Sequence, residues 1–212
     1  MTLAMPSLNR LPAAERGITI GDFLVPIRIG ESISSRARHV ILIAIGTAFV
    51  ALCAQIYIPA DPVPFTGQTL GVLLVGGALG FRRAAIALLV YLALGAIGLP
   101  IYAQARSGTG VLLGPTGGYI VGFVLAAAFV GRLAELGWDR RLIGAVGAML
   151  LGNAVIYAVG VPWLAVTRNL TPQAAIAAGL TPFLLWDALK LLVAAGLFPV
   201  AWWIVGRRPG ER

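Results

Sequence analysis

Long apolar stretches, separated by short polar loops, make up most of this chain from residue 40 onward. The pattern predicts six helical segments, at about 40–58, 66–80, 84–98, 117–134, 142–163 and 182–206. Apolar segments of about 15 to 25 residues suit helices that cross a hydrocarbon core roughly 30 Å thick. Residues 1–38 are mixed and partly polar and show no secretory signal pattern. We therefore predict an all-α integral membrane protein with a cytoplasmic N-terminal extension (1–38), a membrane domain of six transmembrane helices (39–206) and a cytoplasmic tail (207–212).

The composition supports a membrane location and argues against a nucleic-acid partner. The chain of 212 residues is 59% hydrophobic and 11% charged, whereas soluble domains contain roughly 25% charged residues. A net charge of +8 would suggest nucleic acid as a partner of a soluble protein. Here the arginines fall in short clusters between apolar segments, which is typical of topology control. Lipid headgroups of the bilayer are the expected partners of this charge.

The distribution of basic residues predicts the orientation of the six helices. If the N-terminus is cytoplasmic, thirteen of the sixteen basic residues lie on the cytoplasmic side. Arg106 and Arg168 lie outside, and Lys190 lies within the membrane. This bias fits the positive-inside rule with six crossings, and five or seven crossings would break it. Both termini are therefore expected in the cytoplasm.

Lys190 is the only lysine of the chain, and it lies in an apolar segment three residues after Asp187. A cation at the centre of a membrane helix costs roughly 2.5 to 3.5 kcal/mol on insertion scales. Asp187 lies on the same helix face and can offset this cost. One interpretation is a neutralised ion pair that helps helices pack, and the other is a ligand site. We favour the ligand site because ionisable residues within membranes commonly mark function.

Three further polar residues are expected near this pair, in the outer half of the membrane. At 1.5 Å per residue, Asp187 and Lys190 lie about 8 and 12 Å from the outer end of their helix, and Asn153 about 15 Å from the outer end of its own. Gln68 and Tyr119 begin the outer ends of two other helices. The inner half is almost entirely apolar, which indicates a cup open to the outside rather than a channel.

The chemistry of this cup suits a small polar group, such as a urea, an amide or a carboxylate, held between apolar walls. Each polar residue also has a structural interpretation. Gln68 and Tyr119 can cap helix ends or anchor the chain at the interface, and Asn153 can bridge two helices. The case for a ligand site rests on their convergence.

Enzymatic chemistry receives no support from the sequence. Cys53 and His39 are the only cysteine and histidine, so no cysteine or histidine cluster is available for a metal. Asp187 is the only acid within a predicted span, which leaves no carboxylate pair for acid–base catalysis. A phosphate-binding GxxxxGK[ST] loop is also missing. We therefore expect no catalytic residues, no metal, no cofactor and no ATP hydrolysis by this chain alone.

Ala44 and Ala48 form a small-xxx-small pair on the first predicted helix. Such pairs allow membrane helices to approach closely. The pair serves either internal packing or the docking of another membrane subunit, and composition alone does not separate these two roles.

Several motifs together resemble the BioY family, the biotin-binding S components of energy-coupling factor (ECF) transporters. The resemblance covers about 40–206, almost the whole predicted membrane domain. It rests on Pro62–Gln68 (PVPFTGQ), Tyr91 with Gly95–Pro100 (GAIGLP), Gly114–Tyr119 (GPTGGY) with Gly122, and Asp187 with Lys190. The N-terminal extension departs from the usual short start of the family, so the resemblance implies nothing for residues 1–38.

The resemblance implies an S-component-like bundle of six helices in a prokaryotic cell membrane, with a biotin pocket near the outer face. It further implies a transmembrane coupling subunit and two ATP-binding subunits as partners. Asp187 and Lys190 would contact biotin, and the loop from Arg106 to Thr109 would reach its valerate end. Ala44 and Ala48 would dock on the coupling subunit. The alternatives are an S component for another small vitamin, or a membrane scaffold or enzyme.

Overall fold

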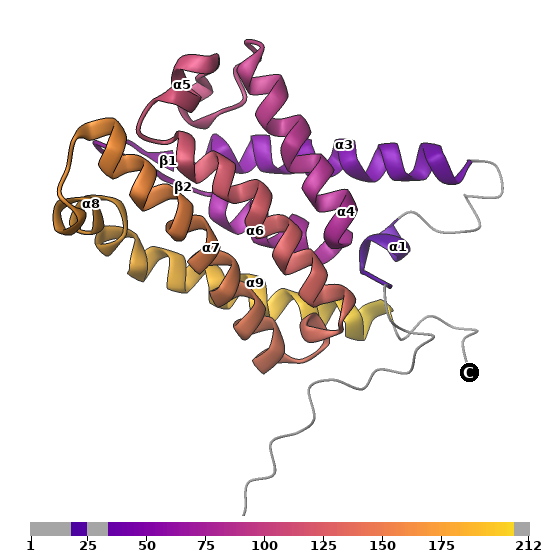
Figure 1. Cartoon of the computed structure of the whole chain (residues 1–212). Coiled ribbons are helices and arrows are strands. Elements are labelled where there is room, and N and C mark those ends of the chain that lie inside the picture. Colours follow the sequence, from indigo (N-terminus) through magenta and orange to yellow (C-terminus); the bar gives the residue numbers. More distant parts are fainter. Residues whose placement is uncertain (1–17, 25–33, 206–212) are drawn as a thin grey trace, which may run out of the picture.

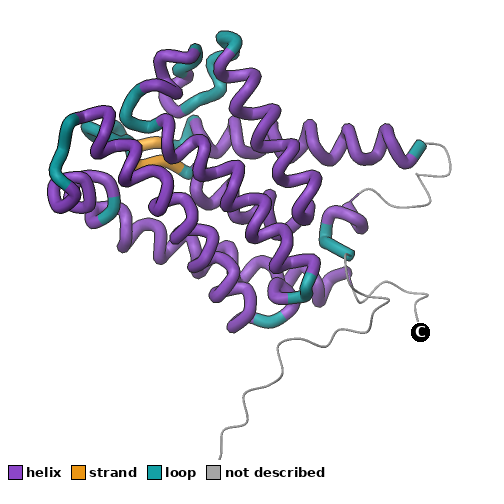
Figure 2. The backbone as a smooth tube through the Cα atoms, in the orientation of Figure 1, coloured by secondary structure: helices purple, strands orange, loops and turns teal. Residues whose placement is uncertain are grey.

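The computed structural model describes residues 18–24 and 34–205, and these residues are almost entirely helical (Figures 1 and 2). Its long helices are α3 (Ser35–Ala54), α4 (Gln68–Ala96), α6 (Gly117–Glu135), α7 (Leu142–Arg168) and α9 (Leu184–Val205). Short α-helices are α1 (Gly21–Leu24), α5 (Thr109–Leu113) and α8 (Pro172–Gly179), and short 3-10 helices cover Ala103–Ala105, Trp138–Arg140 and Thr181–Phe183. Two short antiparallel strands, β1 (Tyr57–Ile58) and β2 (Phe65–Thr66), pair in the loop between α3 and α4.

Five helical stretches of the described chain are long and apolar enough to cross a membrane. These are Arg36–Ala54, Gln68–Ala96, Gly117–Glu135, Leu142–Arg168 and Pro172–Val205. Large apolar side chains remain exposed along them, among them Leu185, Leu192 and Trp203 on α9. Lipid is the solvent that accommodates such a surface. The structure therefore agrees with the predicted multi-pass membrane protein.

Helix α4 is two helices joined by a sharp turn at Gly80. This glycine has a φ of 79°, inside a stretch that is otherwise helical. The side-chain nitrogen Nε2 of Gln68 donates a hydrogen bond of 2.8 Å to the Tyr91 hydroxyl, 23 residues away. In a continuous helix these residues would be about 35 Å apart. The chain therefore reverses direction at Gly80, and the two halves correspond to the predicted segments at about 66–80 and 84–98.

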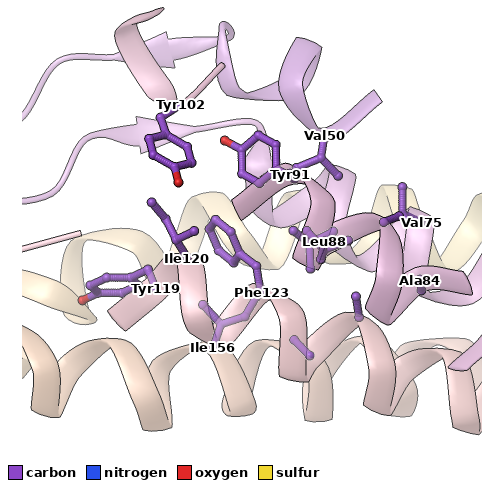
Figure 3. Packing of buried hydrophobic residues seen from close by; sticks show 14 of the residues in the cluster. Val50, Val75, Ala84, Leu88, Tyr91, Tyr102, Tyr119, Ile120, Phe123 and Ile156 are labelled. Carbon is purple, nitrogen blue, oxygen red and sulfur yellow. The ribbon is translucent and has the colours of Figure 1, made fainter. Parts of the chain in front are cut away.

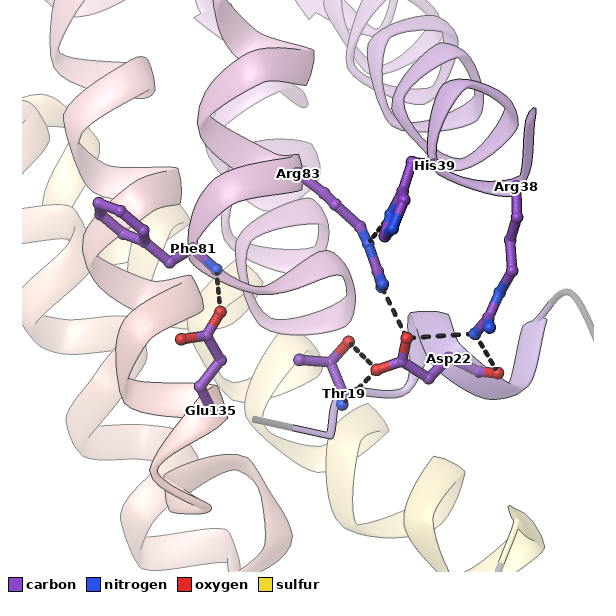
Figure 4. A network of polar contacts seen from close by, with 7 residues as sticks. All are labelled: Thr19, Asp22, Arg38, His39, Phe81, Arg83 and Glu135. Carbon is purple, nitrogen blue, oxygen red and sulfur yellow. Dashed lines mark hydrogen bonds and ion pairs between the residues drawn. The ribbon is translucent and has the colours of Figure 1, made fainter. Parts of the chain in front are cut away.

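The turn in α4 depends on glycine and on an acid from α6. A φ of 79° is in the left-handed region that favours glycine. A Cβ at residue 80 would also lie 2.9 Å from the Glu135 carboxylate. That carboxylate accepts a hydrogen bond of 2.9 Å from the backbone amide of Phe81, directly after the turn (Figure 4). The two predicted segments are separated in the sequence by Phe81, Arg82 and Arg83, whereas the break itself lies at Gly80.

Helix α6 lies between α4 and α7 and forms the centre of the bundle (Figure 1). Small residues allow this close packing, since a Cβ at Gly76 of α4 would lie only 2.9 Å from the Ala127 carbonyl of α6. Around this contact the core is filled by buried side chains such as Leu88, Phe123 and Ile156 (Figure 3). The helices are thereby held in one arrangement, which fixes the residues at their ends.

The C-terminal end of α7 differs from the prediction. Helix α7 continues to Arg168 instead of ending near residue 163, because Asn169 terminates it in the left-handed conformation, with a φ of 50°. Helix α8 follows in a segment that the apolar pattern predicts as a loop. The Thr171 hydroxyl caps α8 by accepting from the Ala174 amide, and Pro172 occupies the first turn.

Residues 18–24 pack against the turn of α4 at the other end of the bundle. Asp22 forms ion pairs with Arg38 (3.1 Å) and Arg83 (2.8 Å), and its carboxylate accepts from the Thr19 amide (Figure 4). Burial acts to raise the pKa of Asp22, but the Thr19 amide and the two arginines outweigh it and lower this pKa below its usual value. Part of the predicted N-terminal extension is therefore fastened to the membrane domain.

Candidate ligand-binding site

A cavity lies near the end of the bundle where β2, the loop 99–116 and the first residues of α9 meet. The empty space between its walls, including the open mouth, is about 660 Å³, which is in the range of small-molecule sites. Apolar side chains such as Phe123, Ile156 and Phe183 form much of its wall. Figure 3 shows Phe123 and Ile156. The polar lining of the cavity consists of Thr66, Gln68, Thr69, Tyr102, Arg106, Thr116, Tyr119, Tyr157, Asp187 and Lys190.

Asp187 and Lys190, two of the predicted site residues, line this cavity as a bonded pair. The Lys190 ammonium lies 2.9 Å from the Asp187 carboxylate. It also donates to the Thr66 carbonyl (2.6 Å) and to the Thr69 hydroxyl (3.2 Å). The Asp187 carboxylate accepts further bonds from the hydroxyls of Thr69 (3.1 Å) and Tyr157. The pair therefore connects α9 to β2, α4 and α7.

These contacts satisfy most of the hydrogen-bonding capacity of the pair. An ammonium has three N–H donors, and each donor of Lys190 has a partner. A carboxylate has about four acceptor positions, and three of those on Asp187 are occupied. The pair thus joins helices, as the packing interpretation expected, and it faces the cavity, as the ligand interpretation expected. A ligand can engage it through the remaining acceptor position or by replacing the bonds to Thr66 and Thr69.

Gln68 and Tyr119 also line the cavity, but their polar atoms have partners within the protein. The Gln68 amide nitrogen donates to Tyr91, and its oxygen accepts from the Thr66 hydroxyl at 3.1 Å. The Tyr119 hydroxyl donates to the Gly179 carbonyl at 2.8 Å. These bonds fix the two side chains in place, so that Tyr119 offers its ring to the cavity rather than its proton.

The other predicted site residues are placed differently. Arg106 lines the mouth of the cavity. Thr109 is exposed on α5 and is not among the lining residues. Asn153 is buried on α7, one turn from Tyr157, and it too is absent from the lining. Its side-chain oxygen has no hydrogen-bond partner among the described residues, so the helix-bridging interpretation is not observed either.

Ala44 and Ala48 lie on an exposed face of α3, next to each other by helical spacing. Exposed apolar neighbours, Val40, Ile41, Ile45 and Leu52, extend this face. This exposed face can contact lipid, or it can contact a helix of another membrane subunit.

Thr69, Tyr157 and Phe183 are lining residues that were not predicted from the sequence. Two of them lie close to predicted site residues. Thr69 follows Gln68 directly, and Tyr157 lies four residues after Asn153, on the same face of α7. Phe183 precedes the membrane helix in the short 3-10 helix Thr181–Phe183 and stacks on Phe65 at 4.5 Å between ring centroids. Its position depends on the folding of that loop.

The electrostatic character of the cavity follows from its three charged lining residues. Asp187 and Lys190 neutralise each other at 2.9 Å. Arg106 is exposed, and its guanidinium makes no hydrogen bond or ion pair within the described ranges 18–24 and 34–205. The lining therefore has a neutral polar end at the pair and an unpaired positive charge at the mouth. This arrangement suits an elongated ligand with a neutral polar head and an anionic tail.

Comparisons with known proteins agree on one family. Residues 28–207 match the model of the BioY family. The chain is 42% identical over 158 residues to the biotin transporter BioY of Thermotoga maritima, covering 74% of this chain and 92% of that protein. It is 37% identical over 172 residues to the biotin transporter BioY of Rhodobacter capsulatus, covering 74% and 88%.

A solved structure shows the same architecture. It is the crystal structure of the S-component for biotin from an ECF-type ABC transporter. The TM-score is 0.71 at 26% identity, over 79% of this chain and 92% of that chain.

Proposed function

This chain belongs to the BioY family, and from this membership we propose that it binds biotin and serves biotin uptake as the S component of an ECF transporter. Its role is then transport and not catalysis. It captures the vitamin from outside and delivers it inward, and the energy comes from ATP hydrolysed by other subunits.

The observation that carries this proposal is the match between the two ends of the cavity and the two ends of biotin. The ureido ring of biotin has two N–H donors and one carbonyl acceptor. Asp187 supplies acceptors and Lys190 supplies donors at the inner end of the cavity. The valerate carboxylate matches Arg106 at the mouth. A hydrogen bond to a charged group contributes roughly 1.5 to 3 kcal/mol, so each of these contacts would strengthen biotin binding by roughly 10- to 150-fold.

The same proposal assigns the topology. Counting the two halves of α4 separately gives six crossings, and it explains why the arginines cluster at one end of the bundle. Both termini then lie in the cytoplasm and the cavity opens to the outside of the cell membrane. Residues 1–38, 39–206 and 207–212 are the cytoplasmic extension, the membrane domain and the cytoplasmic tail.

The partners follow from the transporter type. A transmembrane coupling subunit docks on the α3 face that contains Ala44 and Ala48, and two ATP-binding subunits power the cycle. Replacement of both alanines by leucine is expected to weaken assembly with the coupling subunit while biotin binding by the isolated chain is unchanged. Loss of biotin binding in that variant would argue against a docking role.

Titration of the purified full chain with biotin, thiamine and riboflavin tests the ligand assignment. We expect saturable 1:1 binding of biotin and at least a 100-fold preference over the other two vitamins. Tighter binding of thiamine or riboflavin would identify an S component for another vitamin. Absence of binding to all three would favour a scaffold role.

A further inference from the structure

A second hollow adjoins the mouth of the cavity and continues it outward. It is formed by the loop 59–64, the turn around Gln104, and the end of α7. Three of its lining residues, Pro64, Arg106 and Thr116, also line the cavity. The empty space of this outer hollow, including its open side, is about 890 Å³. A ligand that approaches from this side therefore passes through the hollow before it reaches the pair.

The charges of the outer hollow differ from those of the rest of that side. Arg106 and Arg168 are the two arginines that the six-crossing topology places outside, and both line the hollow. Asp61 is the one acid in its lining. Two cations and one anion give the hollow a positive balance, and the three outer loops that supply them contain no other charged residue.

Arg168 is held only weakly by its partner. Its guanidinium lies 2.9 Å from the Asp61 carboxylate, and the two side chains are 43% and 85% exposed. Exposed ion pairs of this kind contribute about 0 to 1 kcal/mol. An incoming carboxylate can therefore replace Asp61 at little cost. Arg168 is the last residue of α7. The helix therefore positions its side chain at the hollow, and no strong bond is needed to hold it there.

From this geometry we propose that Arg168 is a capture residue, which binds the carboxylate of an incoming ligand in the outer hollow before that carboxylate passes to Arg106. Asp61 competes with the ligand for the same guanidinium and so moderates the capture. The inference rests on the proposed function, because it takes the carboxylate-bearing vitamin as the ligand. It assigns a step on the approach path to a residue outside the cavity.

Capture of this kind acts on the association rate and depends on ionic strength, because it works through the field of a charged hollow. We expect Arg168→Ala to lower the association rate of biotin several-fold at low salt, with a smaller effect near 0.15 M salt. Biotin methyl ester has no carboxylate, and its association rate is expected to be unchanged. Asp61→Asn is expected to raise the association rate of biotin, because it frees the guanidinium.

The experiment is stopped-flow association of biotin and of its methyl ester with the full chain in lipid nanodiscs. Arg82→Ala, which removes an arginine at the opposite end of the bundle, is the control. Opposite shifts in Arg168→Ala and Asp61→Asn support capture. Equal slowing in both variants would identify the ion pair as a structural clasp, and an unchanged rate in Arg168→Ala would also overturn the inference.

Two further readouts separate the possible failures. If Arg168→Ala does not fold, as judged by its melting temperature, Arg168→Gln takes its place. Opposite shifts of the association rate in Arg168→Gln and Asp61→Asn then support capture, and equal slowing or an unchanged rate in Arg168→Gln overturns it. If the unchanged chain does not bind biotin at all, the proposed function is overturned and the capture step with it. If the chain binds biotin with an association rate that no variant alters, only the capture step is overturned.

Discussion

Replacing Asp187 and Lys190 together separates their two interpretations, because stability and ligand binding then respond differently. Lys190→Met alone leaves the Asp187 carboxylate, whose side chain is 6% exposed, without its counter-ion. Breaking a buried ion pair in this way costs about 3 to 5 kcal/mol. Lys190 is 21% exposed, and the Thr69 and Tyr157 hydroxyls still donate to Asp187. We therefore expect a loss nearer about 2 to 3 kcal/mol.

The double variant Asp187→Asn/Lys190→Met removes both charges. Replacing both members of a buried ion pair by uncharged residues often leaves stability unchanged. The amide oxygen of the introduced asparagine still accepts from Thr69 or Tyr157. The free energy of unfolding of the double variant is therefore expected within about 1 kcal/mol of that of the unchanged chain. Binding should not recover, since two hydrogen bonds to charged groups are lost at about 1.5 to 3 kcal/mol each. This corresponds to at least a roughly 100-fold weaker Kd for biotin.

Thermal melting of the detergent-solubilised proteins and isothermal titration with biotin measure the two quantities on the same samples. Asp139→Asn is the matched control, because Asp139 is also a buried acid but does not line the cavity. Its Kd is expected to match that of the unchanged chain. A double variant that is stable and binds biotin within about threefold of the unchanged chain would show that the pair serves packing alone.

Three further predictions follow from other parts of the structure. Arg106→Ala is expected to weaken biotin binding about 10-fold or more, by loss of one charged contact. Biotin methyl ester, titrated in parallel, should bind both proteins with an equal Kd. An equal loss of affinity for the ester would contradict a carboxylate contact. Burial raises the pKa of Asp139 to about 6 from 3.8, so the folded chain holds this proton more tightly than the unfolded chain. Stability should therefore fall as pH rises from about 4 to about 6, by at most about 3 kcal/mol. Melting curves of Asp139→Asn should lack this component, and a pH dependence identical to that of the unchanged chain would refute it. Gly95→Ala places a Cβ 2.2 Å from the Tyr102 ring, so we expect a loss of stability of about 1 to 3 kcal/mol and weaker biotin binding. A Cβ at Gly110 would have no neighbour within 4 Å. Gly110→Ala should therefore match the unchanged chain in stability and in Kd.

The sequence predicted the helices well where apolar runs end at clear polar breaks. Lys190 and Asp187 were found because a charge in an apolar helix is costly and their spacing places them on one face. The turn within α4 falls next to the polar break that Arg82 and Arg83 make between two predicted segments, although Gly80 forms the turn itself. The sequence does not reveal which of many glycines has a positive φ. A pair of charges between apolar segments, in contrast, marks the position of a helix break.

The details of the cavity were less accessible from the sequence. Depth along a helix gives the height of a residue but not the direction in which its side chain points. Depth alone predicted Asn153 as a site residue, yet Tyr157, four residues further along α7, lines the cavity and Asn153 does not. Likewise, the internal partners of Gln68 and Tyr119 come from Tyr91 and Gly179. Such contacts between distant parts of the chain depend on helix rotation and loop folding, which periodicity does not specify.

A crystal or cryo-electron microscopy structure of the full chain with biotin bound tests the central claim most directly. We predict the ureido ring beside Asp187 and Lys190, with at least one bond from the pair to the ring, and the valerate carboxylate directed to Arg106. Biotin at another place, with the bonds from Lys190 to Thr66 and Thr69 unchanged, would contradict the claim.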